Sequence, residues 1–324
     1  MHLVVTGGAG FIGSNYCRLV LARTEDRVTV YDALTYAGNR STLRDVERRF
    51  GARFRFVQGD VCDARAFAAA AKGADAVLHF AAESHVDRSI TGPDAFVVTN
   101  CVGTNTVMRV CSELGVGRVV HIGTDEVYGS VETGRSAETG PLAPRSPYSA
   151  SKAGADLIAL SYHATYGLPV VVTRSANNFG PWQYPEKVIP RFTTNLLEGK
   201  RVPLYGDGLN QRDWLHVDDN CAGIDLVLRE GKEGEIYNLG AGAEITNREL
   251  TERILALVGA GPERIEVVAD RPGHDRRYAL DTSKARALGW SPTRSLDGAL
   301  AETVEWYRDN RWWWEPLVSA PSSR

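Results

Sequence analysis

Short apolar runs that alternate with helix-like stretches constrain the fold of this chain more than any other feature. Helix-like patterns lie between the runs, for example over 12–23 and 64–72. Strands that are apolar on both faces and alternate with helices favour a parallel sheet covered on both sides. Right-handed crossovers then predict an α/β fold with a doubly wound, Rossmann-type sheet. The predicted strands are HLVVTG (2–7), RVTVYD (27–32), FRFVQGD (54–60), AVLHFAA (76–82), RVVHIGT (118–124) and PVVVTRS (169–175).

The pattern changes after about residue 176. Pro and Gly become frequent, as in NNFGPWQYPEKVIP and RVPLYGDGLN, and the predicted elements shorten. We therefore predict a sheet domain over 1–176 and a smaller, interleaved α/β region over 177–324 that binds substrate, with some segments returning to the sheet. The last residues, SAPSSR, are typical of a frayed tail.

Composition and charge exclude several classes of protein. The 324 residues carry 37 Lys and Arg against 40 Asp and Glu, a net charge of −3, which indicates no nucleic-acid-binding surface. No apolar run approaches the roughly 18–20 residues that span a bilayer, and the first residues lack the apolar segment of a signal peptide. The five scattered cysteines contain no CxxC pair, so we expect no metal site and no disulfide framework. These features predict a cytoplasmic enzyme with free thiols.

A glycine-rich turn follows the first predicted strand. Gly7, Gly10 and Gly13 lie in VVTGGAGFIGSN, which then opens a helix. Glycines let such a turn tighten, let backbone N–H groups approach a pyrophosphate, and let the helix pack on the strand. A glycine trio is also compatible with a plain tight turn, but the strand before it and the helix after it favour a dinucleotide site.

Polar or small residues end the next three predicted strands. Asp32 ends the second, where a carboxylate accepts hydrogen bonds from a ribose diol and repels a 2′-phosphate. This favours NAD over NADP, and the alternative for Asp32 is a helix or turn cap. Asp60 and Val61 follow the third strand, where they would edge the adenine. The small residues of FAAES (80–84) end the fourth and leave room for the cofactor.

A tyrosine and a lysine lie four residues apart in SPYSASKAGAD. On a helix, Tyr148 and Lys152 share one face. A lysine beside a phenol stabilises the phenolate and lowers the pKa of the tyrosine from its reference of about 10. Such a tyrosine takes a proton from an alcohol while hydride leaves for nicotinamide. An ordinary amphipathic helix has the same spacing, but Thr124 ends the fifth predicted strand, where it can bond the same substrate oxygen.

Two acids, Asp125 and Glu126, follow Thr124 directly. Hydride transfer alone does not need them, whereas elimination of water from a sugar needs one group to remove a proton from carbon and another to protonate the leaving hydroxyl. Two nearby carboxyls with separated pKa values can divide these tasks. The alternative is loop solvation or a helix cap.

Motifs along nearly the whole chain resemble the nucleotide-sugar branch of the extended short-chain dehydrogenase/reductase family, and within it the 4,6-dehydratases. The TDE triplet distinguishes the 4,6-dehydratases from related 4-epimerases, because the epimerases carry small uncharged residues in place of the two acids. The matching stretches are TGGAGFIGSN, YDALTYAGN, HFAAESHVDRSI, GTDEVYG, PYSASKAGAD, NNFGPWQYPEKVIP, PLYGDG, RDWLHVDDN and RPGHDRRYALD.

The resemblance implies dehydration of dTDP-glucose, or a closely related nucleotide sugar, to the 4-keto-6-deoxy product with a tightly bound, recycled NAD. Tyr148, supported by Lys152, would be the base at the C4 hydroxyl. Glu126 would remove the C5 proton, and Asp125 would protonate the C6 hydroxyl as it leaves. Residues 1–176 would bind NAD and 177–324 the nucleotide sugar.

The resemblance also implies a set of binding residues. Toward NAD it adds Phe11, Ile12, Leu34, Thr35, Phe80, Ala81, Ala82, Ser84, Thr99 and Asn177, with Tyr148 and Lys152 themselves. Toward substrate it gives Ser84, Thr124, Asn178, Glu186, Lys187, Val188, Pro203, Leu204, Tyr205, Arg212, Asn247, Arg271 and His274. His85 and Asp87 are interpreted as loop scaffolding, because the proton chemistry is already covered.

Two alternatives stay open. One is another enzyme on the same scaffold, a 4-epimerase or a decarboxylating variant. The other is a catalytically silent NAD-binding or regulatory protein, which the complete set of Thr124, Tyr148, Lys152 and the two acids argues against. Family members dimerise through two long helices per subunit, which here would be the stretch around 94–114 and the Tyr148–Lys152 helix.

Overall fold

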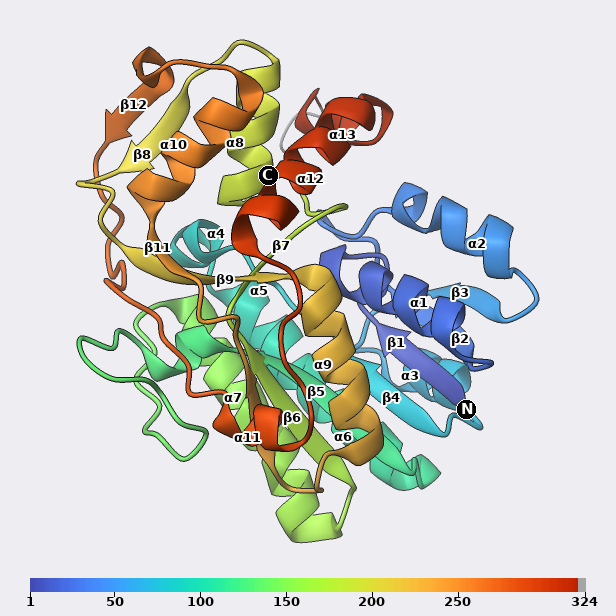
Figure 1. Ribbon diagram of the computed structural model, residues 1–324. Helices are drawn as coiled ribbons and strands as arrows, with labels where there is room; N and C mark the ends of the chain where they lie inside the picture. Colours follow the sequence, from blue (N-terminus) through green and yellow to red (C-terminus); the bar gives the residue numbers. More distant parts are fainter. Residues whose placement is uncertain (320–324) are drawn as a thin grey trace.

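A seven-stranded parallel sheet forms the centre of the molecule in the computed structural model, which describes residues 1–319 (Figure 1). Each of the predicted runs forms a strand, and a seventh strand comes from the second half of the chain. The predicted doubly wound sheet is confirmed. In spatial order the strands are β10 (Ile236–Leu239), β6 (Val170–Ser175), β5 (Arg118–Thr124), β4 (Ala76–His79), β1 (His2–Thr6), β2 (Arg27–Asp32) and β3 (Phe54–Gln58).

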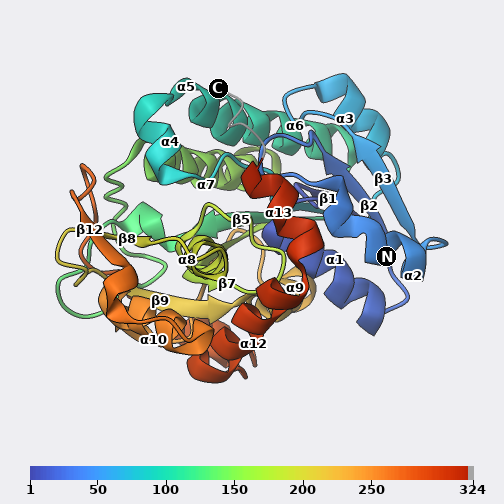
Figure 2. The ribbon, with the colours of Figure 1, turned by 90° about the horizontal axis from the view of Figure 1, so that it is seen from above.

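Helices cover both faces of this sheet (Figure 2). Consecutive residues such as Leu3, Val4 and Val5 are fully buried, because side chains on both faces of β1 pack under helices. On one face α1 packs against α9, and on the other α6 packs between α3 and α7. The bounds are α1 (Phe11–Arg23), α9 (Val217–Glu230), α3 (Ala64–Ala71), α6 (Thr104–Leu114) and α7 (Pro147–Tyr166).

The order of the strands reverses at β1. From β1 the chain moves through β2 to β3 on one side, and then crosses to β4 and β5 on the other. The loops after β1 and β4 therefore diverge at the carboxyl ends of these strands and leave a crevice between them. Such switch points are where ligands bind in doubly wound sheets.

The second half of the chain forms a smaller lobe above this edge of the sheet (Figure 1). Its apolar cluster includes Phe179, Ile189, Trp214 and Leu250. Because α9 packs on α1 and β10 pairs with β6, segments of the predicted second domain return to the sheet; the boundary at residue 176 stays a prediction. The elements of the lobe are β7 (Asn177–Phe179), β9 (Gln211–His216) and β11 (Glu244–Thr246) in one sheet, β8 (Val202–Tyr205) and β12 (Ile265–Val268) in another, and helices α8 (Val188–Leu197), α10 (Asn247–Val258) and α12 (Leu296–Asp309).

Shorter elements complete the fold. They are η1 (Arg40–Leu43), α2 (Arg44–Phe50), α4 (Val86–Thr91), α5 (Asp94–Phe96), the π-helical segment η2 (Val97–Gly103), η3 (Asp125–Tyr128), η4 (Pro262–Arg264), α11 (Ser283–Ala287) and α13 (Arg311–Ser319). The predicted frayed tail falls on residues 319–324, of which 320–324 lie outside the described residues.

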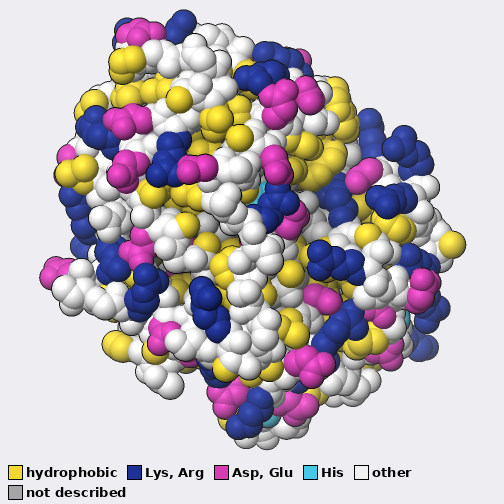
Figure 3. Space-filling view, viewed as in Figure 1, with side chains coloured by type: hydrophobic (Ala, Val, Ile, Leu, Met, Phe, Trp, Pro, Cys, Tyr) yellow, Lys and Arg dark blue, Asp and Glu magenta, His cyan; other side chains and the backbone are white. Residues whose placement is uncertain are grey.

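Three general features bear on function. Positive and negative side chains are interspersed on the face shown in Figure 3. No helix within residues 1–319 is long and apolar enough to cross a bilayer, and no cluster of His, Cys, Asp or Glu in that range could hold a metal ion. All five cysteines are free thiols.

Candidate active site

Two adjoining cavities, of about 320 Å³ and about 180 Å³, open at the carboxyl edge of the sheet. The first is lined by the loops after β1, β2, β3 and β4 and by the end of β5. The second lies between α4, α8, β8 and β9 and the segment 271–278. The two cavities share part of their lining, which we call the shared wall. A ligand in one cavity would therefore lie next to a ligand in the other. That wall consists of Glu126, Asn177, Asn178, Gln183, Glu186 and Lys187.

The glycine turn after β1 leaves no space for side chains. Gly7 has a φ of +67°, and a Cβ there would lie 2.6 Å from the backbone nitrogen of Ala81, in the loop after β4. A Cβ on Gly13 would lie 2.5 Å from the carbonyl oxygen of Gly7. Gly10 precedes the first residue of α1, so the N-terminal end of a 13-residue helix faces this turn. The geometry fits a pyrophosphate at a helix N-terminus.

Asp32 ends β2 and lines the first cavity. Its Oδ2 accepts the N–H of Ala9 at 2.9 Å, and its Oδ1 accepts the N–H of Leu34 at 2.8 Å. Burial raises the pKa of Asp32, and these two N–H groups act against that rise. Asp32 therefore does cap a turn, as the alternative predicted. Its carboxylate also borders the cavity where a ribose diol would lie, and its binding of the ribose stays a prediction.

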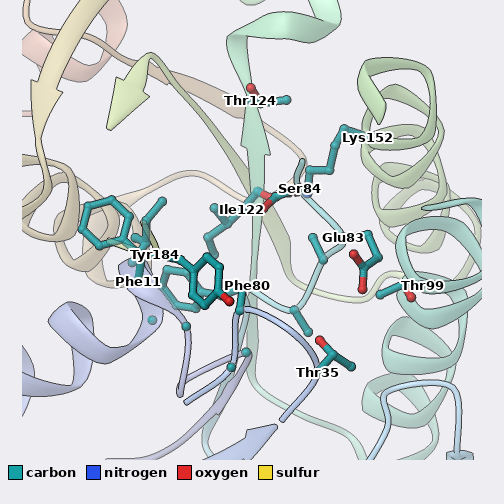
Figure 4. Close-up of a pocket in the computed structure, with 18 of the residues that line it drawn as sticks. Phe11, Thr35, Phe80, Glu83, Ser84, Thr99, Ile122, Thr124, Lys152 and Tyr184 are labelled. Atoms are coloured by element: carbon teal, nitrogen blue, oxygen red, sulfur yellow. Dashed lines mark hydrogen bonds between the residues drawn. The ribbon is translucent and has the colours of Figure 1, made fainter. Parts of the chain in front are cut away.

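All but one of the residues predicted to bind NAD line the first cavity. Leu34 does not, and its side chain packs against the apolar core instead. In Figure 4, Thr99 and Lys152 approach the cavity from neighbouring helices, and Phe11, Phe80 and Tyr184 gather on the other side. Those that line it are Gly7, Gly10, Phe11, Ile12, Gly13, Asp32, Thr35, Asp60, Val61, Phe80, Ala81, Ala82, Ser84, Thr99, Tyr148, Lys152 and Asn177.

Several residues of the first cavity were not predicted. Tyr36 and Tyr184 lie in motifs quoted above, but neither carries a charge or spacing that marks it. Glu83 is held through its backbone: the buried Asn100 side chain accepts its N–H at 2.9 Å and donates to its carbonyl at 3.0 Å. The unpredicted residues include Tyr36, Ala37, Gly38, Glu83, Gln183 and Tyr184.

The helix α7 carries Tyr148 and Lys152 into the first cavity. Ser146 caps it through a reciprocal pair of hydrogen bonds with Ser149, and Pro147 occupies its first position. This cap fixes where the helix begins, so the tyrosine and the lysine lie in its first two turns. Both side chains are buried, and Lys152 Nζ donates to the carbonyl oxygen of Ile122 at 2.6 Å.

The pKa of Tyr148 shows that one sequence prediction is wrong. We predicted that Lys152 lowers it, but it lies well above its ordinary value. Burial disfavours the phenolate most, and the neighbouring Glu126 and Asp125 add negative charge, which outweighs the hydrogen bond from Thr124. The ammonium group of Lys152 donates to the carbonyl oxygen of Ile122, and its positive charge does not outweigh these effects.

The end of β5 brings the two acids beside Tyr148. Thr124 Oγ1 accepts the N–H of Glu126 at 3.3 Å and donates to Asp125 Oδ1 at 3.3 Å, so it caps the 3₁₀ turn that holds both acids. Asp125 is 3% exposed, and its Oδ2 is buried without a hydrogen-bond partner among the described residues. A buried, unsatisfied carboxyl oxygen is costly, which indicates that it is kept for a ligand.

The two acids have different electrostatic surroundings. Burial raises the pKa of Asp125 well above its ordinary value, and Glu126 and Asp213 add to the rise. Burial also raises the pKa of Glu126, but three cations oppose it, namely Arg271, Lys187 and Arg212. Asp125 is thus suited to hold a proton and Glu126 to give one up, which is the separation that a divided acid and base require.

The second cavity is lined by cationic and aromatic side chains. Arg212 Nη2 donates to the carbonyl oxygen of Asp275 at 2.8 Å, and its guanidinium lies 4.2 Å from the centre of the Tyr278 ring. The predicted substrate residues in this lining are Asn178, Glu186, Lys187, Val188, Pro203, Leu204, Tyr205, Arg212, Asn247, Arg271 and His274, whereas Ser84 and Thr124 line the first cavity. Those not predicted include Arg191, Trp214 and Tyr278.

Asp87 was interpreted as loop scaffolding, and the structure corrects this. Its carboxylate lines the second cavity and accepts from Arg271 Nη1 at 3.3 Å and from Tyr205 Oη at 3.4 Å. His85 also lines this cavity, and it serves the loop as predicted, since its side chain accepts the N–H of Arg88 as the cap of α4. No pattern in the sequence indicates that α4 lies against the segment around residue 271, nearly two hundred positions away.

Comparison with known proteins identifies the family. A family model described as GDP-mannose 4,6 dehydratase matches residues 4–303, so the chain belongs to this family. The predicted membership in the nucleotide-sugar branch of the extended short-chain dehydrogenase/reductases is confirmed.

Individual relatives are similar over nearly their whole lengths. The dTDP-glucose 4,6-dehydratase of Streptomyces antibioticus is 54% identical over 99% of this chain and 97% of its own. The structure of DesIV, the dTDP-glucose 4,6-dehydratase of Streptomyces venezuelae, with NAD and dTDP bound, is 56% identical, with a TM-score of 0.96 and coverage of 98% and 100%. The UDP-glucose 4-epimerase of Thermus thermophilus, in complex with NAD, is 32% identical, with a TM-score of 0.88 and coverage of 96% and 100%.

Proposed function

We propose that this chain is a dTDP-glucose 4,6-dehydratase, a lyase that forms dTDP-4-keto-6-deoxy-glucose with a bound, recycled NAD. The observation that carries the proposal is the position of the two acids near Tyr148: Asp125 is buried in the lining of the first cavity, and Glu126, half-buried, belongs to the wall that the two cavities share. An epimerase has no step that uses these two acids. The high identity to dehydratases of two Streptomyces species supports the same reaction.

The first cavity fits NAD. The glycine cradle would hold the pyrophosphate, Asp32 the ribose diol, and Asp60 and Val61 the adenine edge, with Asn177 near the shared wall. When bound, NAD accepts the hydride from C4 of the sugar and later returns it to C6. The identity of NAD rather than NADP rests on Asp32, because its buried carboxylate leaves no site for a 2′-phosphate.

The redox step needs a proton acceptor at the C4 hydroxyl. Tyr148 takes that proton, and Thr124 donates a hydrogen bond to the same oxygen. Lys152, four residues along the same face of α7, supplies a positive charge that opposes the burial and the two acids, both of which raise the pKa of Tyr148. Ser84 and Thr124 hold the sugar from the side of the cofactor.

The elimination step divides between the two acids. The ketone at C4 acidifies the C5 proton, which Glu126 removes, because its nearby cations favour the carboxylate. Asp125 holds a proton in its buried site and gives it to the C6 hydroxyl, which leaves as water. The two carboxyls thereby act as base and acid in one step.

The second cavity holds the nucleotide. Arg212 and Arg271, with His274 and Asn247, supply donors for the diphosphate, for which a forked guanidinium is well matched. Pro203, Leu204 and Tyr205 present an apolar and stacking surface to the base. Asn178, Glu186, Lys187 and Val188 surround the glucose near the shared wall.

Mass spectrometry of the product tests the function. The purified chain, mixed with dTDP-glucose and no added NAD, is expected to give a product lighter by one water. A product of unchanged mass would instead favour the 4-epimerase, which shares the fold. Parallel reactions with UDP-glucose and CDP-glucose measure the base preference, and we expect the thymidine nucleotide to react fastest.

We further propose a cytoplasmic homodimer. Val97, Val98 and Val102 of η2 are each 50% exposed, and Leu157 of the adjacent α7 is 58% exposed, so neighbouring helices present an apolar face. Light scattering is expected to give twice the mass of the chain, and Leu157→Glu to give the monomer. Five free thiols are compatible with a reducing compartment.

A further inference from the structure

A cluster of buried charges adjoins Lys152 and has no part in the chemistry described so far. Asp156 follows Lys152 by one turn of α7, and its carboxyl group is fully buried. Arg174 Nε, from β6, donates to Asp156 Oδ2 at 2.8 Å. On the other side, His121 Nε2, from β5, lies 3.2 Å from Asp156 Oδ1. The exposed fractions of Arg174 and His121 are 2% and 1%.

Burial of such a charged cluster has a large unfavourable contribution to the free energy of folding. Burying ions removes them from water, and replacing a buried ion pair with apolar side chains is often neutral or stabilising. Here one carboxylate accompanies two buried cations, Arg174 and Lys152. The apolar core on either side, with Val120, Val171 and Val172 fully buried, would accept apolar replacements. We therefore attribute the cluster to its electrostatic effect on neighbouring groups rather than to a gain in stability.

The carboxylate and the ammonium meet along the same stretch of β5. Lys152 Nζ donates to the carbonyl oxygen of Ile122, and a Cβ on the next residue, Gly123, would lie 3.0 Å from Asp156 Oδ1. Residues four apart on a helix share one face, so both side chains of α7 are directed at this stretch.

The other titratable groups around Lys152 cannot replace the carboxylate. His79 of β4 is bonded between Thr6 and Thr104, and burial lowers its pKa well below the ordinary value, so it is neutral. Burial also lowers the pKa of His121. Cys101 of η2 is a thiol whose pKa burial raises. Among the groups packed against Lys152, Asp156 is thus the one that carries a negative charge.

The electrostatics agree with this geometry. Burial lowers the pKa of Lys152, and Asp156 acts against that fall. Burial alone would raise the pKa of Asp156, but His121, Arg174 and Lys152 together hold it below the ordinary value. The carboxylate is therefore ionised and opposes the loss of the proton from Lys152.

We propose that Asp156, held by Arg174 and flanked by His121, is a positioning residue for the redox step that keeps Lys152 an ammonium ion within the buried site. The inference rests on the proposed function only in that Lys152 must be charged to support Tyr148. Asp156 touches neither cavity, so it would act on the reaction entirely through Lys152.

The pH dependence of the first hydride step tests this. A single turnover of the chain with dTDP-glucose is followed by the absorbance of reduced nicotinamide, which requires Tyr148 and Lys152 but not the loss of water. The rate of this hydride step is expected to fall as the pH rises through the pKa of Lys152, because Lys152 then loses its positive charge. The pH of this fall is the alkaline limit of the reaction. Asp156→Asn is expected to move this alkaline limit to lower pH by about one unit, and Asp156→Glu to leave it near that of the unchanged chain.

Two controls separate charge from packing. Thr173→Val removes a buried hydroxyl next to Arg174 without changing any charge, and is expected to leave the limit in place. In a Lys152→Arg background the guanidinium stays charged, so the shift caused by Asp156→Asn is expected to vanish. An unmoved limit in Asp156→Asn, or a shift that persists in the arginine background, would overturn the proposal. If Asp156→Asn does not fold, His121→Gln has to shift the limit in the same direction by a smaller amount.

A second readout separates this inference from the proposed function. If the unchanged chain forms no reduced nicotinamide with dTDP-glucose, the proposed function fails. The same variants are then read by the ultraviolet absorbance of the Tyr148 phenolate, taken as the difference from Tyr148→Phe, which needs no sugar nucleotide. Loss of the ammonium charge in Asp156→Asn is expected to raise the pH at which the phenolate appears; a lowered or unchanged value contradicts the inference.

Discussion

The two cavities meet at one wall but are built by different means. The first is shaped mainly by backbone, since its glycine turn and small residues leave space at the ends of neighbouring strands. The second is shaped by charged and aromatic side chains from α4, α8, β8, β9 and the segment 271–278. Substitutions in the glycine turn of the first cavity should therefore act through steric fit, and those in the second cavity through charge. The two acids, Glu126 in the shared wall and Asp125 next to it, should follow neither rule, because they transfer protons in the reaction.

The largest effect is expected next to that wall. Asp125→Asn should slow the loss of water by about 10²–10⁴-fold while oxidation at C4 continues, so that reduced nicotinamide or the 4-keto-glucose nucleotide accumulates. Glu126→Gln should abolish exchange of the C5 hydrogen with solvent. Product analysis by mass spectrometry and deuterium incorporation measure the two steps separately.

The matched control for the acids is Glu132→Gln, an exposed acid shortly after the same turn and outside both cavities. It should behave as the unchanged chain. If Asp125→Asn loses water at the normal rate, Asp125 is not the acid. If exchange of the C5 hydrogen persists in Glu126→Gln, Glu126 is not the base.

A smaller effect is expected from steric change in the first cavity. Gly7→Ala forces a Cβ toward the backbone of Ala81 and should weaken NAD retention by roughly tenfold to a hundredfold, from a clash of about 1–3 kcal/mol. The measurement is the NAD content that remains after gel filtration.

Gly73→Ala is the control for Gly7→Ala, because it separates the backbone strain of a positive φ from the steric clash. Gly73 also has a positive φ, +73°, but a Cβ there meets nothing within 4 Å, and it lies outside both cavities. It should cost about 1 kcal/mol of stability and leave NAD retention unchanged. Equal loss of NAD in both variants would show that fold stability, rather than the cradle, governs retention.

An effect of similar size, but caused by charge, is expected in the second cavity. Arg271→Met removes one guanidinium from the proposed diphosphate site and should raise KM by about 10–100-fold, the effect of a charge-assisted hydrogen bond. Because Arg271 also opposes the rise in the pKa of Glu126, a smaller fall in kcat should accompany the rise in KM. Steady-state kinetics with dTDP-glucose provide the measurement. Arg276→Met, which removes an exposed arginine paired with Asp207, is the control and should leave KM unchanged. A fall in kcat with KM intact would place Arg271 in the chemistry instead.

The same contrast explains what the sequence could predict. The strands of the sheet and the residues of the first cavity were predictable because each lies in a short motif with a regular spacing. Strand β10 was missed, since its four residues, Ile236–Leu239, give too weak a pattern. The run 76–82 was predicted as strand throughout, yet β4 ends at His79, because Phe80 to Ala82 turn into the cavity.

Properties that depend on distant neighbours were beyond the sequence. The pKa of Tyr148 was predicted in the wrong direction, since its value depends on how deeply folding buries the phenol and on how close Glu126 comes. Asp87 was misinterpreted for the same reason: its partners Arg271 and Tyr205 are supplied by the other lobe. Positions of side chains could be inferred from motifs, whereas their electrostatic state could not.

The pairing of β10 with β6 has a consequence for synthesis on the ribosome. The first six strands are complete once residue 175 has been made, but the free edge of β6 has no partner until residues 236–239 emerge. During that interval a strand containing Val170, Val171 and Val172 presents unpaired backbone groups, which can pair with other nascent chains. The growing polypeptide therefore passes through a stage prone to aggregation, and that stage ends only when β10 has been made, which is before α10 and α12 of the second lobe.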